Sequence, residues 1–247
     1  MRVAVISDVH SNLWALEAVL AAVGSVDGVW NLGDTVGYGP EPQAVVDRLR
    51  EAGAIGVRGN HDDAAGGGES IEFFNPDGYR AMQWTRSRID ERTRLYLAGL
   101  PERLVPEGSD FTLAHGSPSD PIWEYLDSPE AAGANLSAFE TPYCLVGHTH
   151  VPRVFRATRG GIASGRVDSR FADSDARLEL DGRRAIINPG SVGQPRDGDP
   201  RSSYMTIDTD AGIVAWHRVA YDITATQAAI LAAGLPAGLA RRLGSGR

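Results

Sequence analysis

The most informative stretch of this sequence is Val57-Arg58-Gly59-Asn60-His61-Asp62-Asp63, where an apolar run breaks at a glycine into ligand-type side chains. Asn60 offers a carbonyl oxygen to a metal cation, and the His61 imidazole can give or take a proton near neutral pH. The alternative is a turn in which glycine and asparagine only supply backbone geometry. We favour ligand chemistry because four similar stretches occur elsewhere, each at the end of an apolar run.

The first sixty residues alternate expected strands with expected helices. Apolar runs predict strands at 2–7, 28–32 and 54–57, with helices from residue 13 and over 41–52 between them. Such alternation predicts right-handed crossovers and a parallel sheet. In parallel sheets ligands bind beyond the carboxyl ends of the strands. The residues that fall there are Asp8, His10, Asp34, Asn60 and His61.

Two later runs repeat the arrangement of a strand followed by ligands. The run at 111–114 is followed by His115, and the run at 143–146 by Gly147-His148-Thr149-His150. From residue 154 onward the sequence becomes β-rich, which predicts a second sheet packed against the first. Strands are expected near 154–157, 183–188, 203–208 and 213–219, with one or two short helices at 224–243.

Residues 64–100 interrupt this pattern of strands that are each followed by ligand residues. Gly66-Gly67-Gly68 predicts a flexible joint, and apolar residues at helical spacing follow between Tyr79 and Leu97. We therefore expect a helical insertion that either caps the site or packs on the flank of the domain. The whole chain, 1–247, is expected to be a single domain, because 247 residues with 42% hydrophobic content can form one large α/β core.

Charge and cysteine content exclude several classes of protein. A net charge of −8 argues against a surface that binds duplex nucleic acid. The single cysteine, Cys144, excludes an internal disulfide framework and fits a reducing cytoplasm. No apolar run approaches the roughly 20 residues of a membrane span. The N-terminus enters a strand at once, without a signal-peptide pattern. We expect a cytoplasmic protein without a membrane partner, and its oligomeric state stays open.

Five of the six histidines lie at the expected strand ends, and only His217 lies within an ordinary alternating strand. Four of the five strand-end histidines, together with two carboxylates and one amide, form a set of possible metal ligands. This set offers oxygen and nitrogen atoms but no thiolate, which suits Mn, Fe, Zn, Co or Ni. This set contains too many ligands for one cation and predicts two cations that share a carboxylate. Its members are Asp8, His10, Asp34, Asn60, His115, His148 and His150.

The order of these motifs resembles that of the calcineurin-like metallophosphoesterase superfamily. The later Asn188-Pro189-Gly190-Ser191 is similar to its compact bacterial phosphodiesterase-like branch, so the resemblance covers roughly residues 1–220. It implies an α/β fold, a four-layer α/β/β/α sandwich with two packed mixed β-sheets. By the family pattern, Asp8, His10, Asp34 and His150 would hold one metal, and Asp34, Asn60, His115 and His148 the other.

The resemblance implies hydrolysis of a small phosphomonoester, phosphodiester or dinucleoside polyphosphate by a metal-bridging hydroxide. Two divalent cations, Mn²⁺ being the first expectation, activate water and withdraw charge from phosphoryl oxygens. His61 would stand over the substrate and protonate the leaving oxygen or hold a phosphoryl oxygen. Asp62 would orient His61, or would only cap a helix or turn. The alternative is a non-catalytic scaffold on the same fold.

Three residues are candidates for substrate contact. Asn12 also suits a helix cap, and Tyr38, like Trp123 and Tyr125, either stacks on a base or aryl group or only packs. Arg196 either clamps a second phosphate or is a solvated charge on a turn. The protein phosphatases of the superfamily follow the bridging aspartate with Asp and Arg, whereas Thr35-Val36-Gly37-Tyr38 stands here. Protein phosphatase activity is therefore disfavoured.

Overall fold

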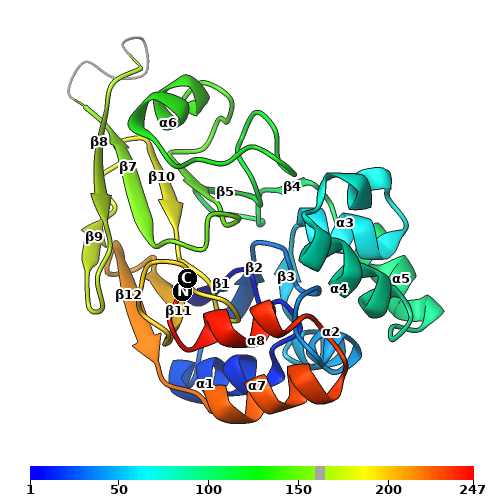
Figure 1. Ribbon diagram of the computed structural model, residues 1–247. Helices are drawn as coiled ribbons and strands as arrows, with labels where there is room; N and C mark the ends of the chain where they lie inside the picture. Colours follow the sequence, from blue (N-terminus) through cyan, green and yellow to red (C-terminus); the bar gives the residue numbers. More distant parts are fainter. Residues whose placement is uncertain (159–164) are drawn as a thin grey trace.

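The computed structural model describes residues 1–158 and 165–247, which form two six-stranded β-sheets with helices on their outer faces (Figure 1). The first sheet has the strand order β3 (Ile55–Gly56), β2 (Gly28–Asn31), β1 (Arg2–Ile6), β11 (Ser202–Asp208), β12 (Ile213–Val219), β9 (Arg177–Glu179). The second has the order β4 (Arg103–Leu104), β5 (Phe111–Ala114), β6 (Tyr143–Leu145), β10 (Ala185–Asn188), β7 (Arg153–Ala157), β8 (Val167–Phe171).

Strand β1 shows how the layers are held together. Successive strand side chains point to opposite faces, so Val3 and Val5 join the core between the two sheets, which also contains Leu145 of the second sheet. Ala4 and Ile6 pack on the other face, in the cluster that contains the apolar side of α1 (Leu13–Val23). On the far side, α6 (Pro129–Asn135) covers the second sheet. The predicted four-layer α/β/β/α sandwich with two mixed sheets is confirmed.

The division of the C-terminal strands between the sheets differs from the prediction. Only β7, β8 and β10 join β5 and β6, whereas β11 pairs antiparallel with β1 and carries β12 into the first sheet. Because β11 is buried along nearly its whole length, it suits the centre of a sheet rather than an edge. The expected parallel pairing holds for β1, β2 and β3, and recurs in β5, β6 and β10.

The segment after β3 is helical, as predicted, but its helices begin earlier. What the sequence indicated as a turn is the first turn of α3 (Asn60–Gly66), and Gly67 ends that helix with a left-handed backbone. A 3₁₀ helix, η1 (Glu69–Phe73), then leads to α4 (Pro76–Arg86) and α5 (Glu91–Ala98). These helices pack on α3 and on α2 (Pro42–Glu51) through one apolar cluster at the right of Figure 1. Most of the insertion therefore lies on the flank.

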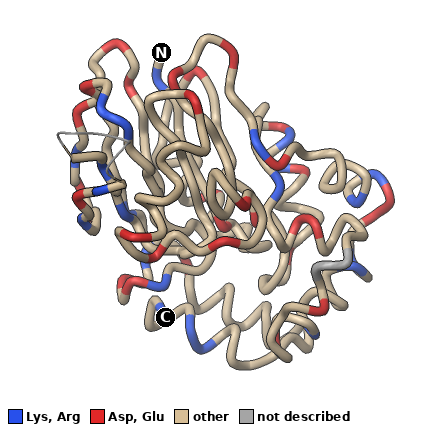
Figure 2. The backbone as a smooth tube through the Cα atoms, turned by 90° about the horizontal axis from the view of Figure 1, so that it is seen from above, with Lys and Arg blue, Asp and Glu red and all other residues tan. Residues whose placement is uncertain are grey.

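The chain ends in α7 (Ile223–Ala232) and α8 (Ala237–Leu243), which lie together beneath the first sheet in Figure 1 and share an apolar cluster with α4. Figure 2 shows acidic and basic residues interspersed over the outer parts of the chain. Among the described residues, no helix has the length and apolar character needed to cross a membrane.

Candidate active site

Most of the predicted metal ligands lie in loops that follow strands, and Asn60 is the first residue of α3. Five of them have left-handed backbone angles, with φ between 48° and 65°. Residues other than glycine adopt this conformation at a cost, and such strain concentrates at functional sites. Gly59 allows the loops to come close together, because a Cβ at this position would lie 2.1 Å from Oδ1 of Asp34. The five ligands are Asp8, His10, Asp34, His148 and His150.

One cluster of ligand atoms contains Asp8, His10, Asp34 and His150, all buried and within 4.8 Å of one another. Nε2 of His10 lies 3.2 Å from Nε2 of His150 and 3.6 Å from Oδ2 of Asp34. Nε2 of His150 lies 3.3 Å from Oδ1 of Asp8. This is the first of the two metal-ligand sets that the family pattern predicts.

A second cluster contains Asp34, His115 and His148. Nε2 of His115 lies 3.4 Å from Oδ2 of Asp34 and 3.0 Å from Nδ1 of His148. Asn60 is buried, and its Oδ1 has no hydrogen-bond partner among the described residues. The same oxygen of Asp34 therefore faces both clusters, which is the position of a bridging carboxylate.

The hydrogen bonds of the four imidazoles show that the clusters fit metal ions. The outer ring nitrogens of His10, His115 and His150 contact main-chain oxygens at 3.1, 2.9 and 2.6 Å, and Nε2 of His148 contacts the main-chain oxygen of Trp123 at 3.2 Å. We assign the ring protons to these nitrogens from the hydrogen-bond network. The inner Nε2 atoms of His10 and His150, 3.2 Å apart, then face each other with lone pairs only. A cation between them resolves this repulsion, and such outer partners typically orient metal-binding histidines.

The pKa values of three of the four rings agree with this assignment. Burial lowers the pKa of His10 and His150, and burial together with His115 lowers that of His148 to about 3. These rings are therefore neutral and able to ligate. His115 is the exception: burial lowers its pKa, but Asp34 and Asp8 outweigh burial and raise this pKa to about 9. Without a cation its Nε2 is therefore protonated, and a bound cation would take the place of that proton. Burial and the charge of Asp34 raise the pKa of Asp8 to about 7.

His61 lies beside the ligand clusters without joining them. Its main-chain N–H donates to Oδ1 of Asp34 at 2.9 Å, and its ring stacks on Phe74 with centroids 4.5 Å apart. Nδ1 is buried against Gly37 and has no hydrogen-bond partner among the described residues. Burial lowers the pKa of His61 to about 4. The ring thus has one enclosed nitrogen and leaves Nε2 as the atom available to a ligand.

Asp62 does not orient His61 through a hydrogen bond. Its Oδ1 accepts the N–H of Val36 and its Oδ2 accepts the N–H of Gly59, at 3.2 Å each. The Oδ2 contact forms part of the capping box at the start of α3. Of the two roles considered for Asp62, the structure favours the capping role, because both carboxylate oxygens accept main-chain N–H groups next to the predicted metal ligands.

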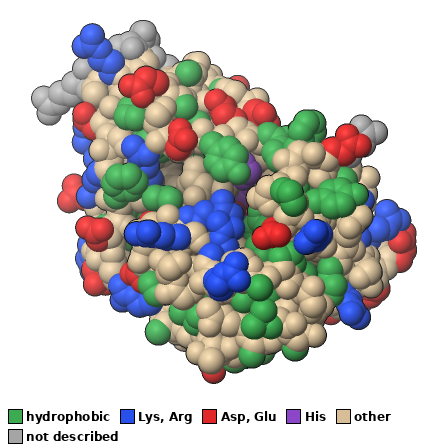
Figure 3. All heavy atoms as spheres, viewed as in Figure 1, with side chains coloured by type: hydrophobic (Ala, Val, Ile, Leu, Met, Phe, Trp, Pro, Cys, Tyr) green, Lys and Arg blue, Asp and Glu red, His purple; other side chains and the backbone are tan. Residues whose placement is uncertain are grey.

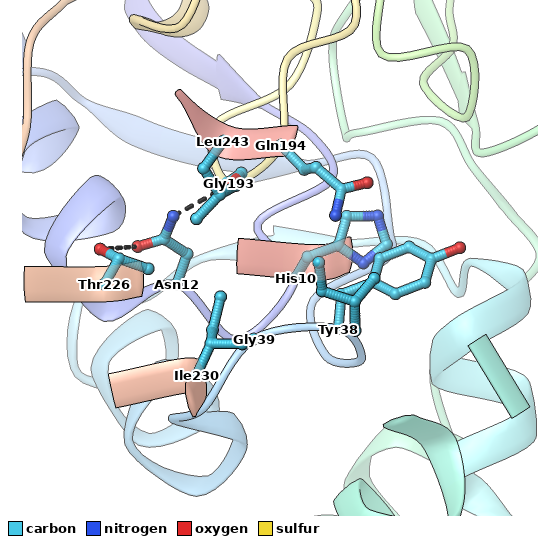
Figure 4. Close-up of a pocket in the computed structure, with 10 residues that line it drawn as sticks. His10, Asn12, Tyr38, Gly39, Gly193, Gln194, Thr226, Ile230 and Leu243 are labelled. Atoms are coloured by element: carbon cyan, nitrogen blue, oxygen red, sulfur yellow. Dashed lines mark hydrogen bonds between the residues drawn. The ribbon is translucent and has the colours of Figure 1, made fainter. Parts of the chain in front are cut away.

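The three candidate substrate residues have different surroundings. Asn12 caps α1: Oδ1 accepts the N–H of Ala15 and the hydroxyl of Thr226, while Nδ2 donates to the main-chain oxygen of Gly193 (Figure 4). Because its amide oxygen accepts two hydrogen bonds and its nitrogen donates one within the protein, we leave Asn12 out of the proposed substrate site. Tyr38 packs its ring on His61 with centroids 4.3 Å apart, and Arg196 lies on a loop beside it.

A cavity of about 410 Å³ opens over the two clusters. Figure 3 shows it as a hollow in which a histidine is visible, with basic side chains below and apolar side chains around the edge. The residues of the two predicted metal-ligand sets lie beneath it and are called its floor. Of these, Asp34, Asn60, His148 and His150 face the cavity, which Tyr38 and Arg196 also line. Its outer part is an aromatic rim, defined as Phe73, Phe74, Trp123 and Tyr125. Sequence reasoning considered Trp123 and Tyr125 but missed Phe73 and Phe74, which the insertion supplies.

The sandwich of two mixed sheets and the buried Asp/His clusters at the strand ends define an α/β protein with a metal site. The model of the calcineurin-like phosphoesterase superfamily domain matches residues 1–212. This chain belongs to that superfamily and is a metal-dependent phosphoesterase. Members of the family bind divalent metals, and the buried Asp/His clusters fit such a site.

Individual relatives support this assignment over the length of the chain. A metallophosphoesterase from Sphaerobacter thermophilus has 46% sequence identity and a TM-score of 0.90, covering 100% of this chain and 99% of its own. An uncharacterized protein of Methanocaldococcus jannaschii, MJ0912, is 36% identical over 253 residues, 99% of this chain and 98% of the relative. The phosphodiesterase YfcE of Escherichia coli is 27% identical over 224 residues, 85% of this chain and 89% of its own.

Proposed function

We propose that this protein is a dinuclear metal-dependent phosphoesterase that hydrolyses a small phosphomonoester, phosphodiester or dinucleoside polyphosphate. The observation that carries the proposal is the pair of buried ligand clusters that share Oδ2 of Asp34 and bring inner imidazole nitrogens together. The first cation would be held by Asp8, His10, Asp34 and His150. The second would be held by Asp34, Asn60, His115 and His148.

When bound, two divalent cations supply Lewis acidity, which activates water and withdraws charge from the phosphoryl oxygens. The protein contributes two carboxylates to their direct ligand sets, Asp8 and Asp34. Four positive charges against two negative ones leave the floor cationic, although the whole chain has a net charge of −8. The floor therefore attracts an anionic ester. The donor set suits Mn²⁺ first, with Fe, Zn, Co and Ni as alternatives.

His61 provides the proton chemistry in this proposal. Its backbone bond to Asp34 and its stacking on Phe74 hold the ring over the floor, and its enclosed Nδ1 leaves Nε2 to face the ester. In the reaction, the oxygen of water bonds to phosphorus and the ester P–O bond breaks. Burial lowers the pKa of His61 to about 4, but an anionic ester bound beside the ring favours its charged form. His61 would then give a proton to the leaving oxygen, or as a neutral ring a hydrogen bond to a phosphoryl oxygen as charge develops there.

The experiment that tests the proposal measures metal content and hydrolysis together. Purified protein is loaded with Mn²⁺ and assayed with p-nitrophenyl phosphate and bis-p-nitrophenyl phosphate, before and after removal of metal by a chelator. We expect two metal ions per chain and turnover that is lost with the metal. Absence of turnover above the blank, together with absence of bound metal, would favour the non-catalytic scaffold.

We also propose a reducing, cytoplasmic location, with the free and buried Cys144 as support.

A further inference from the structure

Two arginines from distant parts of the chain meet beside the metal-ligand clusters. Arg196 lies in a loop between β10 and β11, and Arg242 lies in the last turn of α8. Nη2 of Arg196 and Nη1 of Arg242 donate to the same atom, Oε1 of Gln194, at 3.0 and 3.2 Å. Gln194 therefore holds two guanidinium groups next to each other.

The backbone of the same loop fixes this pair relative to the metal ligands. The main-chain oxygen of Gln194 contacts Nδ1 of His150 at 2.6 Å, and the main-chain N–H of Arg196 donates to the oxygen of His150 at 3.3 Å. Figure 4 shows the side chain of Gln194 beside the rings of His10 and Tyr38, next to the part of α8 that carries Leu243. Arg196 itself lines the cavity, and Gln194 holds the guanidinium group of Arg242 beside that of Arg196.

No acidic side chain in the described part of the chain pairs with these two arginines. Among the described residues, no Asp or Glu side chain lies within ion-pair distance of Arg196 or Arg242. Nε of Arg196 is buried and has no hydrogen-bond partner there, while Nε of Arg242 donates to the main-chain oxygen of Arg247. Burial and the charge of Arg196 lower the pKa of Arg242, against smaller opposite effects of Tyr38 and Asp77. An anion bound beside both groups would relieve this repulsion.

Arg196 also stands where two hollows meet. It lines the cavity over the metal ligands, and on its other side it lines a groove of about 1040 Å³ together with Phe171, Asp197 and Arg247. A group held by Arg196 would therefore lie between the reacting phosphorus and a space that accepts the rest of a longer substrate.

We propose that Arg196 and Arg242 bind a second phosphate group of the substrate, adjacent to the phosphate that is hydrolysed. The proposal rests on the proposed function and narrows its substrate class to phosphoanhydrides and other esters with two neighbouring phosphates. A guanidinium fork matches the geometry of phosphate oxygens and keeps its charge at every physiological pH. The family match ends at residue 212, so the segment beyond the match contributes Arg242 to substrate selection.

The test compares a nucleoside monophosphate with the diphosphate of the same nucleoside, AMP with ADP, at a fixed concentration of free metal ion. Hydrolysis of ADP adds the oxygen of water to the terminal phosphorus, breaks its bond to the bridging oxygen and yields AMP and phosphate. The two substrates have different leaving groups, so their rates are not compared directly. Instead, the ratio of kcat/KM for ADP to kcat/KM for AMP is measured in each variant and compared with the same ratio in the parent enzyme. Arg242→Gln is expected to lower the ratio of ADP to AMP at least tenfold, as is Arg196→Gln.

Arg241→Gln is the matched control, because Arg241 is exposed on the same helix and carries the same charge. It is expected to keep the ratio of the parent enzyme. The double variant Arg196→Gln/Arg242→Gln is expected to lose less than the product of the single effects, because both residues hold one group. Arg242→Lys, which keeps the charge but not the fork, should give an intermediate ratio, and it replaces Arg242→Gln as the test if that variant fails to fold.

The outcomes separate this inference from the function on which it rests. Turnover of both nucleotides with an unchanged ratio in folded Arg242→Gln or Arg242→Lys would overturn the second-phosphate site and leave the phosphoesterase intact. An equal loss of the ratio in Arg241→Gln would also overturn it, because the effect would then be one of general charge. Failure of the parent enzyme to hydrolyse any phosphate ester would overturn the proposed function itself.

Discussion

The floor and the aromatic rim of the cavity are built in opposite ways. On the floor Asp8, His115 and His148 are at most 2% exposed, whereas on the rim Phe73 is 77% and Tyr125 48% exposed. The floor residues follow directly from strands, and backbone hydrogen bonds fix their outer atoms. Loops and a 3₁₀ helix carry the rim. The difference suggests that substitutions on the floor change metal binding or chemistry for every substrate, and that those at the rim change only the choice among substrates.

Asp34→Asn is expected to have the largest effect, because Oδ2 of Asp34 faces both clusters, 3.6 Å from Nε2 of His10 and 3.4 Å from Nε2 of His115. The variant should lose at least one metal ion per chain. Its activity should fall by more than the about 10–100-fold typical of groups that only orient a ligand. The shape of the side chain is kept, and Oδ1 can still accept the N–H of His61. Elemental analysis that finds two ions per folded chain would refute the bridging role.

His61→Asn should reduce kcat by about 10²–10⁴, the usual scale of general acid–base help. Metal content should stay unchanged, because His61 lies outside both ligand clusters. The matched control is His217→Asn in β12, where the histidine contacts Thr206 at 2.8 Å, away from the site, and activity should be kept. If folded His61→Asn were as active as the parent enzyme, His61 would have no part in the mechanism.

The floor could be predicted from the sequence because the pattern that identifies its residues, an apolar run followed by a ligand residue, is local. Each ligand follows an apolar run, and parallel strands bring their carboxyl ends to one edge. His115 and His148 follow neighbouring parallel strands of the second sheet and meet for this reason. Asp34 follows a strand of the first sheet and joins them because the two sheets pack against each other. Most strands and helices could be predicted for the same reason, since local periodicity identifies them.

What the sequence did not predict depends on contacts between distant segments. The pairing of β11 with β1 is decided by burial on both sides, which periodicity alone does not give. Phe74 reaches the cavity only through the course of η1, and Arg242 only through the docking of α8. The capping role of Asp62 was one of two open possibilities, and the N–H groups of Val36 and Gly59 favour it.

Trp123→Leu tests the rim and should have a smaller effect. The ring of Trp123 lies 5.5 Å from that of Phe73 and 5.9 Å from that of Phe74, so it can help to stack on an aryl group. Its main-chain oxygen, which contacts His148, is retained in the variant. Aromatic pairs contribute about 0.5–1.5 kcal/mol, so KM for p-nitrophenyl phosphate should rise about two- to thirteenfold. Glycerol phosphate, which has no ring, should keep its KM. An equal rise for both esters would show that the rim does not select substrates.

Cys144 should have the smallest effect, because it contributes to neither the floor nor the rim. It packs between the second sheet and α6, is 0% exposed, and burial raises the pKa of its thiol well above the ordinary value. A free thiol with a pKa of about 8.5 is half ionised at pH 8.5. The Cys144 thiol stays protonated there, so a thiol reagent should leave the folded protein unlabelled and fully active. The same reagent should label one thiol per chain in denaturant. Rapid labelling of the folded protein at pH 8.5 would mean that the second sheet and α6 separate readily. Cys144 lies in β6, and His148 follows that strand. The floor would then be less rigid than its burial indicates.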